Sequence, residues 1–308
     1  MLRIPRLTLG GCMDSIDEHI LAPAKINLFL RILGRRADGY HLLDSLMLPI
    51  SLYDHVLVRL APSHQSKTCE PVVTVVSDSA EVPNGPLNLA HRAAVLLLTS
   101  VGVCTSVDIS IRKRIPVGSG MGGGSSDAAA VLLALNRLLG SPHGPDELAA
   151  LGAQLGADVA FFVHGRPACI GGIGERVTPV RLRDALPLVV CWDGTPLATK
   201  RVYSLVDLSL TTGKAATSIE PLIGGRALVS NMLVNDLEAA AVKIHPEVLS
   251  LKVRLVEQGA LGALMTGSGS AVFGIWPDHE RARSAAVRLR QFGLWAEAVC
   301  TLEQSPAV

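Results

Sequence analysis

A glycine-rich segment directly before a helical sequence constrains this chain more than any other feature. Five glycines fall between positions 118 and 124, and the alanine- and leucine-rich run that follows ends at Gly140. Glycines let successive backbone N–H groups surround an anion, and a helix N-terminus adds a partial positive charge. The segment predicts a phosphate-binding loop; the alternative is a flexible loop that only caps the helix.

Familiar phosphate-loop patterns fit this segment only in part. Gly118, Gly120 and Gly123 match the spacing of a dinucleotide loop, but the preceding strand alternates apolar and polar residues and Pro116 interrupts the approach. The P-loop pattern fails because no lysine follows Gly123, and protein-kinase, serine-hydrolase and H-E-x-x-H signatures are missing. A Rossmann-type NAD(P)-dependent oxidoreductase and a non-catalytic nucleotide-binding module stay open as alternatives.

Composition limits the class of protein and its partners. The 308 residues are 49% hydrophobic and only 4% aromatic, enough for one large or two medium domains with aliphatic cores. A net charge of +1 gives no footprint for nucleic acid. The six cysteines are scattered, which favours free thiols in a reducing compartment over a zinc site or a disulfide framework.

One stretch raises the question of a membrane, because residues 259–277 carry no charge and the mean hydropathy is +0.38. The stretch contains five glycines and three hydroxyl side chains, which suit a lipid-facing helix poorly. It is interpreted as strand, loop and strand, and no membrane partner is expected.

Periodicity predicts an α+β protein with two domains. Strands are expected at 20–33, 54–60, 72–77, 107–115 and 186–192, and helices at 88–102, 125–140, 145–156, 235–258 and 278–291. We expect a flexible extension over 1–19, a first domain over 20–170 and a second over 171–308.

Several polar residues are candidates for chemistry. Alternation along the first strand places Lys25 and Asn27 on one face with Phe29, where they are either site groups or part of a solvated outer face. Asp158 is a single acid among apolar residues, which usually caps a helix or pairs with a base but can also act as a catalytic base. The small-residue loop 266–270 is explained equally well by a tight turn.

Three segments together carry a resemblance to a known family. Ala22–Asn27, Pro116–Ser126 and Met265–Ser270 occur in the order of the three motifs of the GHMP kinases (galactokinase, homoserine, mevalonate and phosphomevalonate kinases), which the chain resembles. The segments RADGYH (36–41), LGADV (155–159) and NDLE (235–238) are most similar to the branch whose substrate is 4-diphosphocytidyl-2-C-methyl-D-erythritol, in the non-mevalonate isoprenoid pathway. Ala160 departs from this branch, which usually has proline there.

The resemblance implies a fold and a reaction. The N-terminal domain would be an ATP-binding domain like ribosomal S5 domain 2, and the C-terminal domain a ferredoxin-like substrate domain. Asp158 would accept the proton of the substrate 2-hydroxyl, and Lys25 would place positive charge near the transferring phosphoryl group. Another small-molecule kinase of the same family is the alternative.

The resemblance also implies which residues bind which ligand. ATP, with Mg²⁺ as cofactor, would lie over Pro116, Val117, Gly118, Ser119, Gly120, Met121, Gly122, Gly123, Gly124, Ser125 and Ser126, with Ser125 or Ser126 reaching a phosphate oxygen or the magnesium. The diphosphocytidyl methylerythritol substrate would contact Asn27, Tyr40, His41, Tyr203, Thr266, Gly267 and Ser268, with Tyr203 stacking on cytosine. No dedicated metal site, a cytoplasmic location, and a monomer or weak homodimer are expected.

Overall fold

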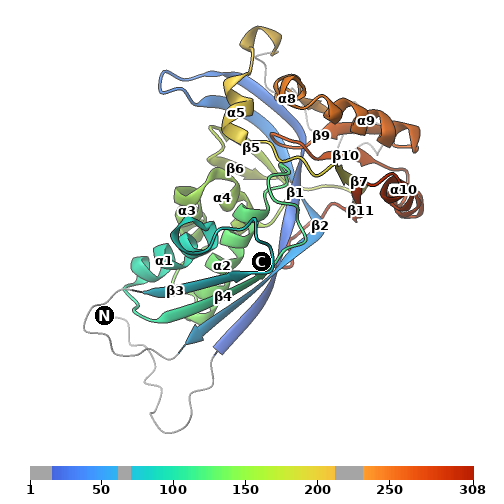
Figure 1. Ribbon diagram of the computed structural model, residues 1–308. Helices are drawn as coiled ribbons and strands as arrows, with labels where there is room; N and C mark the ends of the chain where they lie inside the picture. Colours follow the sequence, from blue (N-terminus) through green and yellow to red (C-terminus); the bar gives the residue numbers. More distant parts are fainter. Residues whose placement is uncertain (1–15, 62–70, 212–231) are drawn as a thin grey trace.

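The computed structural model describes residues 16–61, 71–211 and 232–308 and has two β-sheets (Figure 1). The first sheet contains β1 (Ile16–Arg35), β2 (His41–Ala61), β3 (Val72–Ser77), β4 (Ser106–Arg112), β5 (Ala168–Gly172), β6 (Arg176–Pro179) and β8 (Val234–Asn235). The second contains β7 (Pro187–Trp192), β9 (Gly262–Met265), β10 (Val272–Ile275) and β11 (Trp295–Cys300). The predicted α+β class is confirmed.

The first sheet has the strand order β3-β4-β2-β1-β8, and β5 and β6 continue from one end of β2. Strand β4, which leads to the glycine-rich segment, is antiparallel to β2. A dinucleotide loop of the Rossmann type instead follows a strand of a mostly parallel sheet. The strand arrangement therefore removes the Rossmann-type alternative.

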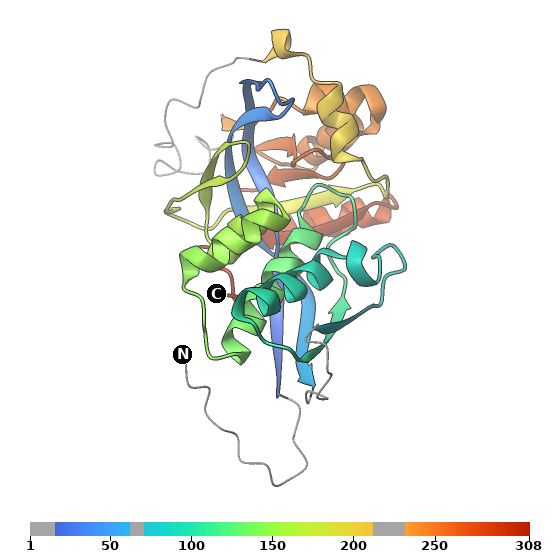
Figure 2. The ribbon, with the colours of Figure 1, turned by 90° about the vertical axis from the view of Figure 1, so that its left-hand side faces the viewer.

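Helices α1 (Leu89–Val101), α2 (Gly123–Leu138), α3 (Pro145–Leu155) and α4 (Ala157–His164) cover one side of this sheet. Figure 2 shows them grouped together over one half of the molecule. Their apolar residues build a first core with the inner faces of β1, β2 and β4. Helix α2 is almost entirely buried, from Ser126 to Asn136, which fixes the helix that follows the glycine-rich segment.

The second sheet is covered by helices on one side and by the first sheet on the other. The helices α8 (Glu238–Ile244), α9 (Glu247–Glu257) and α10 (His279–Gln291) pack on its outer side, where Trp276 is fully buried (Figure 1). The short α5 (Thr199–Ser204) contacts α8. Its inner side packs against Ile26 and Leu28 of β1 through Val190 and Phe273. The two sheets therefore share a core.

Two predicted elements need correction. The single helix expected at 235–258 is two helices, because α8 ends at Ile244 and α9 begins after Pro246, which lacks a backbone N–H. A register shift between Asn27 and Phe29 reverses the alternation of β1, so Phe29 lies in the core between the sheets and not on the face of Lys25.

The predicted boundaries shift as well. Strand β1 begins at Ile16, so residues 16–19 belong to the sheet, while the rest of the expected extension lies outside the described residues. Strands β5 and β6 form a hairpin hydrogen-bonded to β2, so a division at 170 would cut the first sheet, which continues to Pro179. The chain also returns at its end, where the Ser305 N–H donates to the carbonyl oxygen of Gly165 at 2.7 Å.

One cysteine forms a disulfide although the sequence predicts free thiols. Cys104 forms a disulfide, whereas the described cysteines Cys169, Cys191 and Cys300 are free. The expectation that all the thiols are free is therefore wrong for Cys104. Within the described residues, no helix is long and apolar enough to cross a membrane, and 259–277 folds as the predicted strand, loop and strand.

Candidate active site

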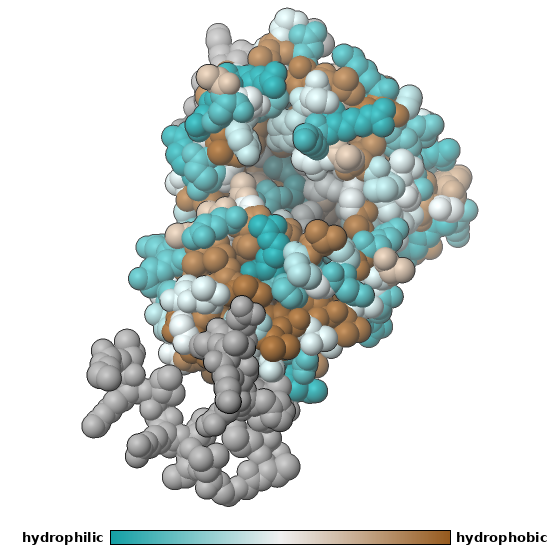
Figure 3. All heavy atoms as spheres, turned by 60° about the vertical axis from the view of Figure 1, so that its left-hand side comes forward, coloured by the Kyte–Doolittle hydropathy of each residue, from teal (hydrophilic) through white to brown (hydrophobic). Residues whose placement is uncertain are grey.

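A cavity of about 520 Å³ opens between the glycine-rich segment, β1, β2 and the loop that joins β9 to β10. Figure 3 shows the hollow on the face turned to the viewer. Of the predicted residues, the cavity wall contains Lys25, Asn27, Pro116, Val117, Gly118, Ser119, Gly120, Gly122, Gly123, Gly124, Ser125, Asp158, Tyr203, Gly267 and Ser268. Most of the predicted site therefore comes together in one place.

Lys25 is buried on β1, with 4% of its surface exposed. Its Nζ donates to Asn27 Oδ1 at 2.7 Å, and within the described part of the chain it has no salt bridge. Burial lowers the pKa of Lys25 below its ordinary value, although the negative charge of Asp158 raises it in part. The protein thus holds the side-chain nitrogen of Lys25 at the cavity wall with a neutral hydrogen-bond partner.

Asn27 connects Lys25 to the loop between β9 and β10. Its backbone N–H donates to Thr266 Oγ1 at 3.0 Å, and its Nδ2 donates to Ser45 Oγ at 2.8 Å. Thr266 is fully buried and does not reach the cavity wall. We therefore assign Thr266 to holding β1 against the loop, and not to direct substrate contact as the resemblance implied.

The two glycine loops pack directly on each other. A Cβ atom at Gly120 would lie 2.5 Å from the carbonyl oxygen of Thr266, and one at Gly267 would lie 2.8 Å from Lys25 Nζ. Both residues also have positive φ, +84° and +56°. Because any side chain would separate these loops, glycine is required here for backbone contact around Lys25 as well as for ligand access.

The start of α2 divides its small residues between the cavity and the core. Gly124 and Ser125 line the cavity, and a Cβ atom at Gly124 would meet nothing within 4 Å. Ser126 and Met121 are buried and do not line the cavity. Of the two serines predicted to reach a phosphate oxygen, Ser125 is the better placed.

Asp158 lies in the first turn of α4, and Gly156, not Asp158, is the N-cap residue. The helix-capping role considered from the sequence therefore does not explain this acid. Asp158 lines the cavity, and its charge acts on both Lys25 and Tyr203. Burial, and then the charge of Asp158, raise the pKa of Tyr203 above its ordinary value.

The residues predicted to recognise a base are only partly together. The rings of His41 and Tyr203 lie 5.4 Å apart at 40°, so strand β2 and helix α5 present neighbouring aromatic faces. Burial and Arg35 lower the pKa of His41, which favours its neutral form. Neither His41 nor Tyr40 lines the cavity, but His41 borders it through its contact with Tyr203. Tyr40 is 61% exposed, so its predicted substrate contact is not supported by its position.

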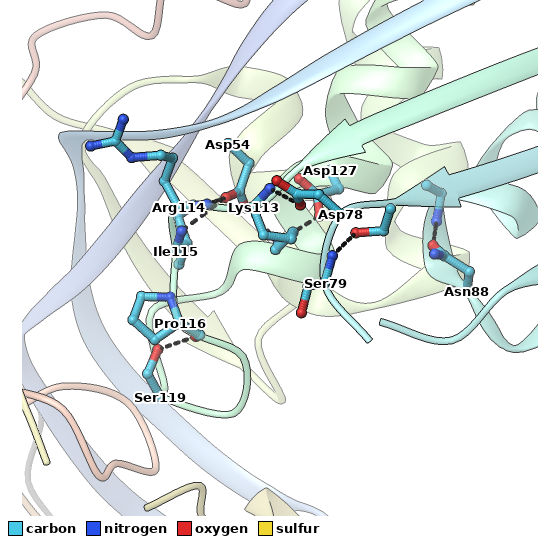
Figure 4. A network of polar contacts seen from close by, with 12 residues as sticks. Asp54, Asp78, Ser79, Asn88, Lys113, Arg114, Ile115, Pro116, Ser119 and Asp127 are labelled. Atoms are coloured by element: carbon cyan, nitrogen blue, oxygen red, sulfur yellow. Dashed lines mark hydrogen bonds and ion pairs between the residues drawn. The ribbon is translucent and has the colours of Figure 1, made fainter. Parts of the chain in front are cut away.

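Sequence reasoning missed a buried charge network beside the glycine-rich segment (Figure 4). Lys113 Nζ contacts a carboxylate oxygen of Asp54 and lies 2.7 Å from Asp127 Oδ2. Burial alone would lower the pKa of Lys113, but the two carboxylates raise it. The signals in the sequence were Asp54 within an apolar strand and a basic run just before Pro116.

Asn235 belongs to the NDLE segment, and it holds the second loop in place. Its Nδ2 donates to the carbonyl oxygens of Met265 and Gly267, each at 2.8 Å, and its Oδ1 accepts the Leu237 N–H at 3.0 Å. All its hydrogen-bonding atoms are used inside the protein. Asn235 therefore fixes the loop that carries Gly267 against Lys25.

Comparison with known proteins gives consistent relatives. Family models described as the GHMP kinases N terminal domain and GHMP kinases C terminal match residues 88–166 and 221–293. A protein from a Geobacter species named 4-diphosphocytidyl-2-C-methyl-D-erythritol kinase is 42% identical over 92% of this chain and 99% of its own length. A protein of the same name from Symbiobacterium thermophilum is 40% identical over 91% of this chain and 98% of its own.

Solved structures agree with the sequence comparison. A crystal structure of 4-(cytidine 5'-diphospho)-2C-methyl-D-erythritol kinase has a TM-score of 0.78 and 39% identity, covering 92% of this chain and 100% of that one. Homoserine kinase from Cytophaga hutchinsonii has a TM-score of 0.71 at 19% identity, covering 98% and 99%, which shows a common fold.

Proposed function

The chain belongs to the GHMP kinase family, and from this membership we propose that it transfers the terminal phosphoryl group of ATP to the 2-hydroxyl of 4-diphosphocytidyl-2-C-methyl-D-erythritol, a step of the non-mevalonate isoprenoid pathway. One observation carries the proposal. Relatives of that name match more than nine-tenths of the chain, and the matched length includes a cavity with Lys25 and Asp158 in its wall.

Asp158 is the proposed general base. The substrate hydroxyl oxygen attacks the γ-phosphorus, the bond from that phosphorus to the oxygen of ADP breaks, and the hydroxyl proton passes to the Asp158 carboxylate. The position of Asp158 in the cavity wall, outside the capping position of α4, supports this role.

Lys25 is the proposed source of positive charge at the transferring group. A buried ammonium acts more strongly on a developing charge than one in water does, and among the described residues no carboxylate forms a salt bridge with Lys25. Asn27 holds its Nζ in place before any ligand is bound.

The ATP phosphates would lie over the start of α2, where Gly124 and Ser125 line the cavity. The described residues contain no group of three His, Cys, Asp or Glu side chains that could hold a metal ion. Mg²⁺ commonly takes one or two protein ligands together with substrate phosphates and water, so Ser125 fits such a partial site. When bound, Mg²⁺ would neutralise charge on the phosphates.

The cytosine end of the substrate would lie at His41 and Tyr203. The two rings are already in contact, and stacking of a base on an aromatic ring contributes about 1–3 kcal/mol. Tyr203→Ala should raise the KM of the alcohol substrate about five-fold or more and leave the KM of ATP nearly unchanged. An equal rise in both KM values would count against this placement.

A coupled assay of ADP release tests the reaction itself. The purified chain would be given ATP and, in parallel, the diphosphocytidyl substrate, homoserine or mevalonate. We expect turnover with the diphosphocytidyl substrate to exceed that with the others by at least 10³ in kcat/KM, because only it can use the aromatic pair. Preferential turnover of homoserine or mevalonate would establish the alternative, another small-molecule kinase of the family.

We also propose a cytoplasmic location, where ATP is supplied, and a monomer or weak homodimer. Cell fractionation and sedimentation velocity at several protein concentrations would test these two statements. A stable higher oligomer at low concentration would contradict the second.

A further inference from the structure

Asp54 is a buried acid that the proposed reaction does not use. It lies on β2 with no exposed surface, and Lys113, Arg114 and Ile115 all donate hydrogen bonds to it. Its Oδ1 accepts the backbone N–H groups of Arg114 at 2.5 Å and Ile115 at 2.8 Å, and its Oδ2 contacts Lys113 Nζ. These residues link the end of β4 to Pro116, which leads into the glycine-rich segment (Figure 4).

Lys113 carries this contact to the other end of the same segment. Its Nζ also donates to Asp127 Oδ2 at 2.7 Å, and Asp127 belongs to the first turns of α2. The backbone N–H of Lys113 donates to Asp78 Oδ1 at 2.8 Å, which fixes the residue from a third side. Asp54, Lys113 and Asp127 therefore form one connected set of charged side chains, which links the residues before Pro116 to those after Gly122.

We propose that Asp54 is a positioning residue for nucleotide binding: through Lys113 and two backbone N–H groups it holds the two ends of the glycine-rich segment at the spacing that the ATP phosphates require. This proposal rests on the proposed function, since it takes that segment as the phosphate site. Asp54 itself does not line the cavity, so it acts only through the residues it holds.

The arrangement favours positioning over general stabilisation of the fold. A buried ion pair often adds little net stability compared with apolar residues of similar size, because the charges lose their hydration. Its geometry is nevertheless specific, and here the hydrogen bonds of Asp54 with Lys113, Arg114 and Ile115 are directed at the entrance of one loop. A group placed only for stability would have no reason to connect the two ends of a ligand-binding segment.

Asp54→Asn tests the proposal, because it keeps one oxygen for the backbone N–H groups and removes the negative charge that holds Lys113. We expect the Kd of ADP, measured by calorimetry, and the KM of ATP to rise about ten-fold. The KM of the diphosphocytidyl substrate and kcat should stay within two-fold of the unchanged protein. Equal rises in both KM values, or an unchanged Kd of ADP, would overturn the proposal.

Two further variants keep the test decisive. Asp127→Asn removes the far contact of Lys113, and Asp127 also lines the cavity, so the variant should raise the Kd of ADP at least about three-fold. An unchanged Kd there overturns the proposal even if Asp54→Asn does not fold. Leu289→Ala removes buried side chain from α10 and lowers stability without touching the loop, and its Kd should be unchanged. If Leu289→Ala raises the Kd of ADP as much as Asp54→Asn does, lower stability alone explains the weaker binding, and the positioning role of Asp54 is overturned.

The outcome separates this proposal from the proposed function. If the unchanged protein binds ADP but does not phosphorylate the diphosphocytidyl substrate, the function fails and the calorimetric comparison still decides the role of Asp54. If the unchanged protein does not bind ADP, both are overturned.

Discussion

Two buried lysines stand beside the same cavity in opposite electrostatic surroundings. Lys113 lies between the carboxylates of Asp54 and Asp127, and its pKa is raised. Lys25 is held by the neutral side chain of Asn27, and burial lowers its pKa. The two residues have the same chemistry and similar burial, so the difference comes from the partners that the fold supplies.

This difference separates two uses of a buried charge. The ammonium of Lys113 already pairs with the carboxylates of Asp54 and Asp127, so its electrostatic attraction holds the glycine-rich segment in place. Within the described part of the chain, Lys25 Nζ donates to the neutral Asn27 and forms no salt bridge, although the charge of Asp158 acts on it, so a bound phosphoryl group could pair with it directly. A buried lysine that the protein leaves uncompensated is therefore the stronger candidate for chemistry.

The largest expected effect is on kcat, when Asp158 or the uncompensated Lys25 is replaced. Asp158→Asn should lower kcat by about 10²–10⁴ because it removes the proposed proton acceptor, and Lys25→Ala should lower it by a similar factor. The double variant should be far less than multiplicatively worse, because the two residues act in one step. Steady-state kinetics with saturating ATP measures all three.

A matched control is available on the neighbouring helix. Asp146 also lies in the first turn of a helix, α3, but it is exposed and away from the cavity wall. Asp146→Asn should keep kcat within two-fold. An Asp158→Asn protein that keeps most of its kcat would remove the role of Asp158 and, with it, the contrast between the two lysines.

The second effect concerns stability at the compensated lysine. Lys113→Met leaves two buried carboxylates facing each other without a cation, which should lower the free energy of unfolding by about 3–5 kcal/mol. Adding Asp54→Asn and Asp127→Asn to that variant should recover part of the loss, since the unpaired charges are gone. Urea denaturation measures both changes, and a loss below about 1 kcal/mol for Lys113→Met would show that Lys113 is not the compensated partner.

The same contrast explains how far the sequence could predict the site. Lys25, Asn27 and the glycine-rich segment are local motifs, so their chemistry is visible in neighbouring letters, and the structure places them in one cavity. The Asp54–Lys113 contact joins residues 59 positions apart, and only the pairing of β2 with β4 brings them together. No local pattern distinguishes such an acid from one that is simply exposed.

Errors in the fold predictions have similar causes. A bulge at Asn27 and Phe29 reverses the face of the residues beyond it, and strict alternation cannot show where an extra residue is inserted. Tyr40 was predicted from its position in a motif, but a turn places it outward while the next residue, His41, faces Tyr203. The motifs therefore predict correctly which segments form the site. They predict less well which side chains of those segments face it.

The third effect is a pH dependence of stability from Asp127. Burial, and to a smaller extent the charge of Asp54, outweigh the attraction of Lys113 and raise the pKa of Asp127 from its ordinary 3.8 to about 7. Between these pH values the folded protein binds the proton that the unfolded chain has lost, so stability falls as pH rises from about 4 to about 7. Because Asp127 titrates together with a neighbouring group, we expect its titration to lower the free energy of unfolding by on the order of 2 kcal/mol over this range.

Asp127→Asn should remove that contribution. The fall in unfolding free energy between pH 5 and pH 8 should be smaller in the variant than in the unchanged protein, because all other groups are the same in both. If the free energy of unfolding changes with pH equally in both proteins, Asp127 does not titrate between pH 5 and pH 8. Its carboxylate would then stay charged beside Lys113 over that whole range.

The smallest expected effect has the opposite sign and belongs to Lys25. Lys25→Met removes an ammonium that is costly to bury, so the free energy of unfolding at pH 8 should rise by about 1 kcal/mol even though activity is lost. The gain is small because Asn27 Oδ1 loses its donor. Since the pKa of Lys25 is lowered in the folded protein, the unchanged protein gains stability as pH rises toward 10.5, and the advantage of the variant should shrink over that range. Urea denaturation of Lys25→Met at pH 8 and pH 10, beside Lys113→Met, measures both the sign and the trend; a loss of stability at Lys25 comparable with that at Lys113 would mean that the fold compensates both lysines alike.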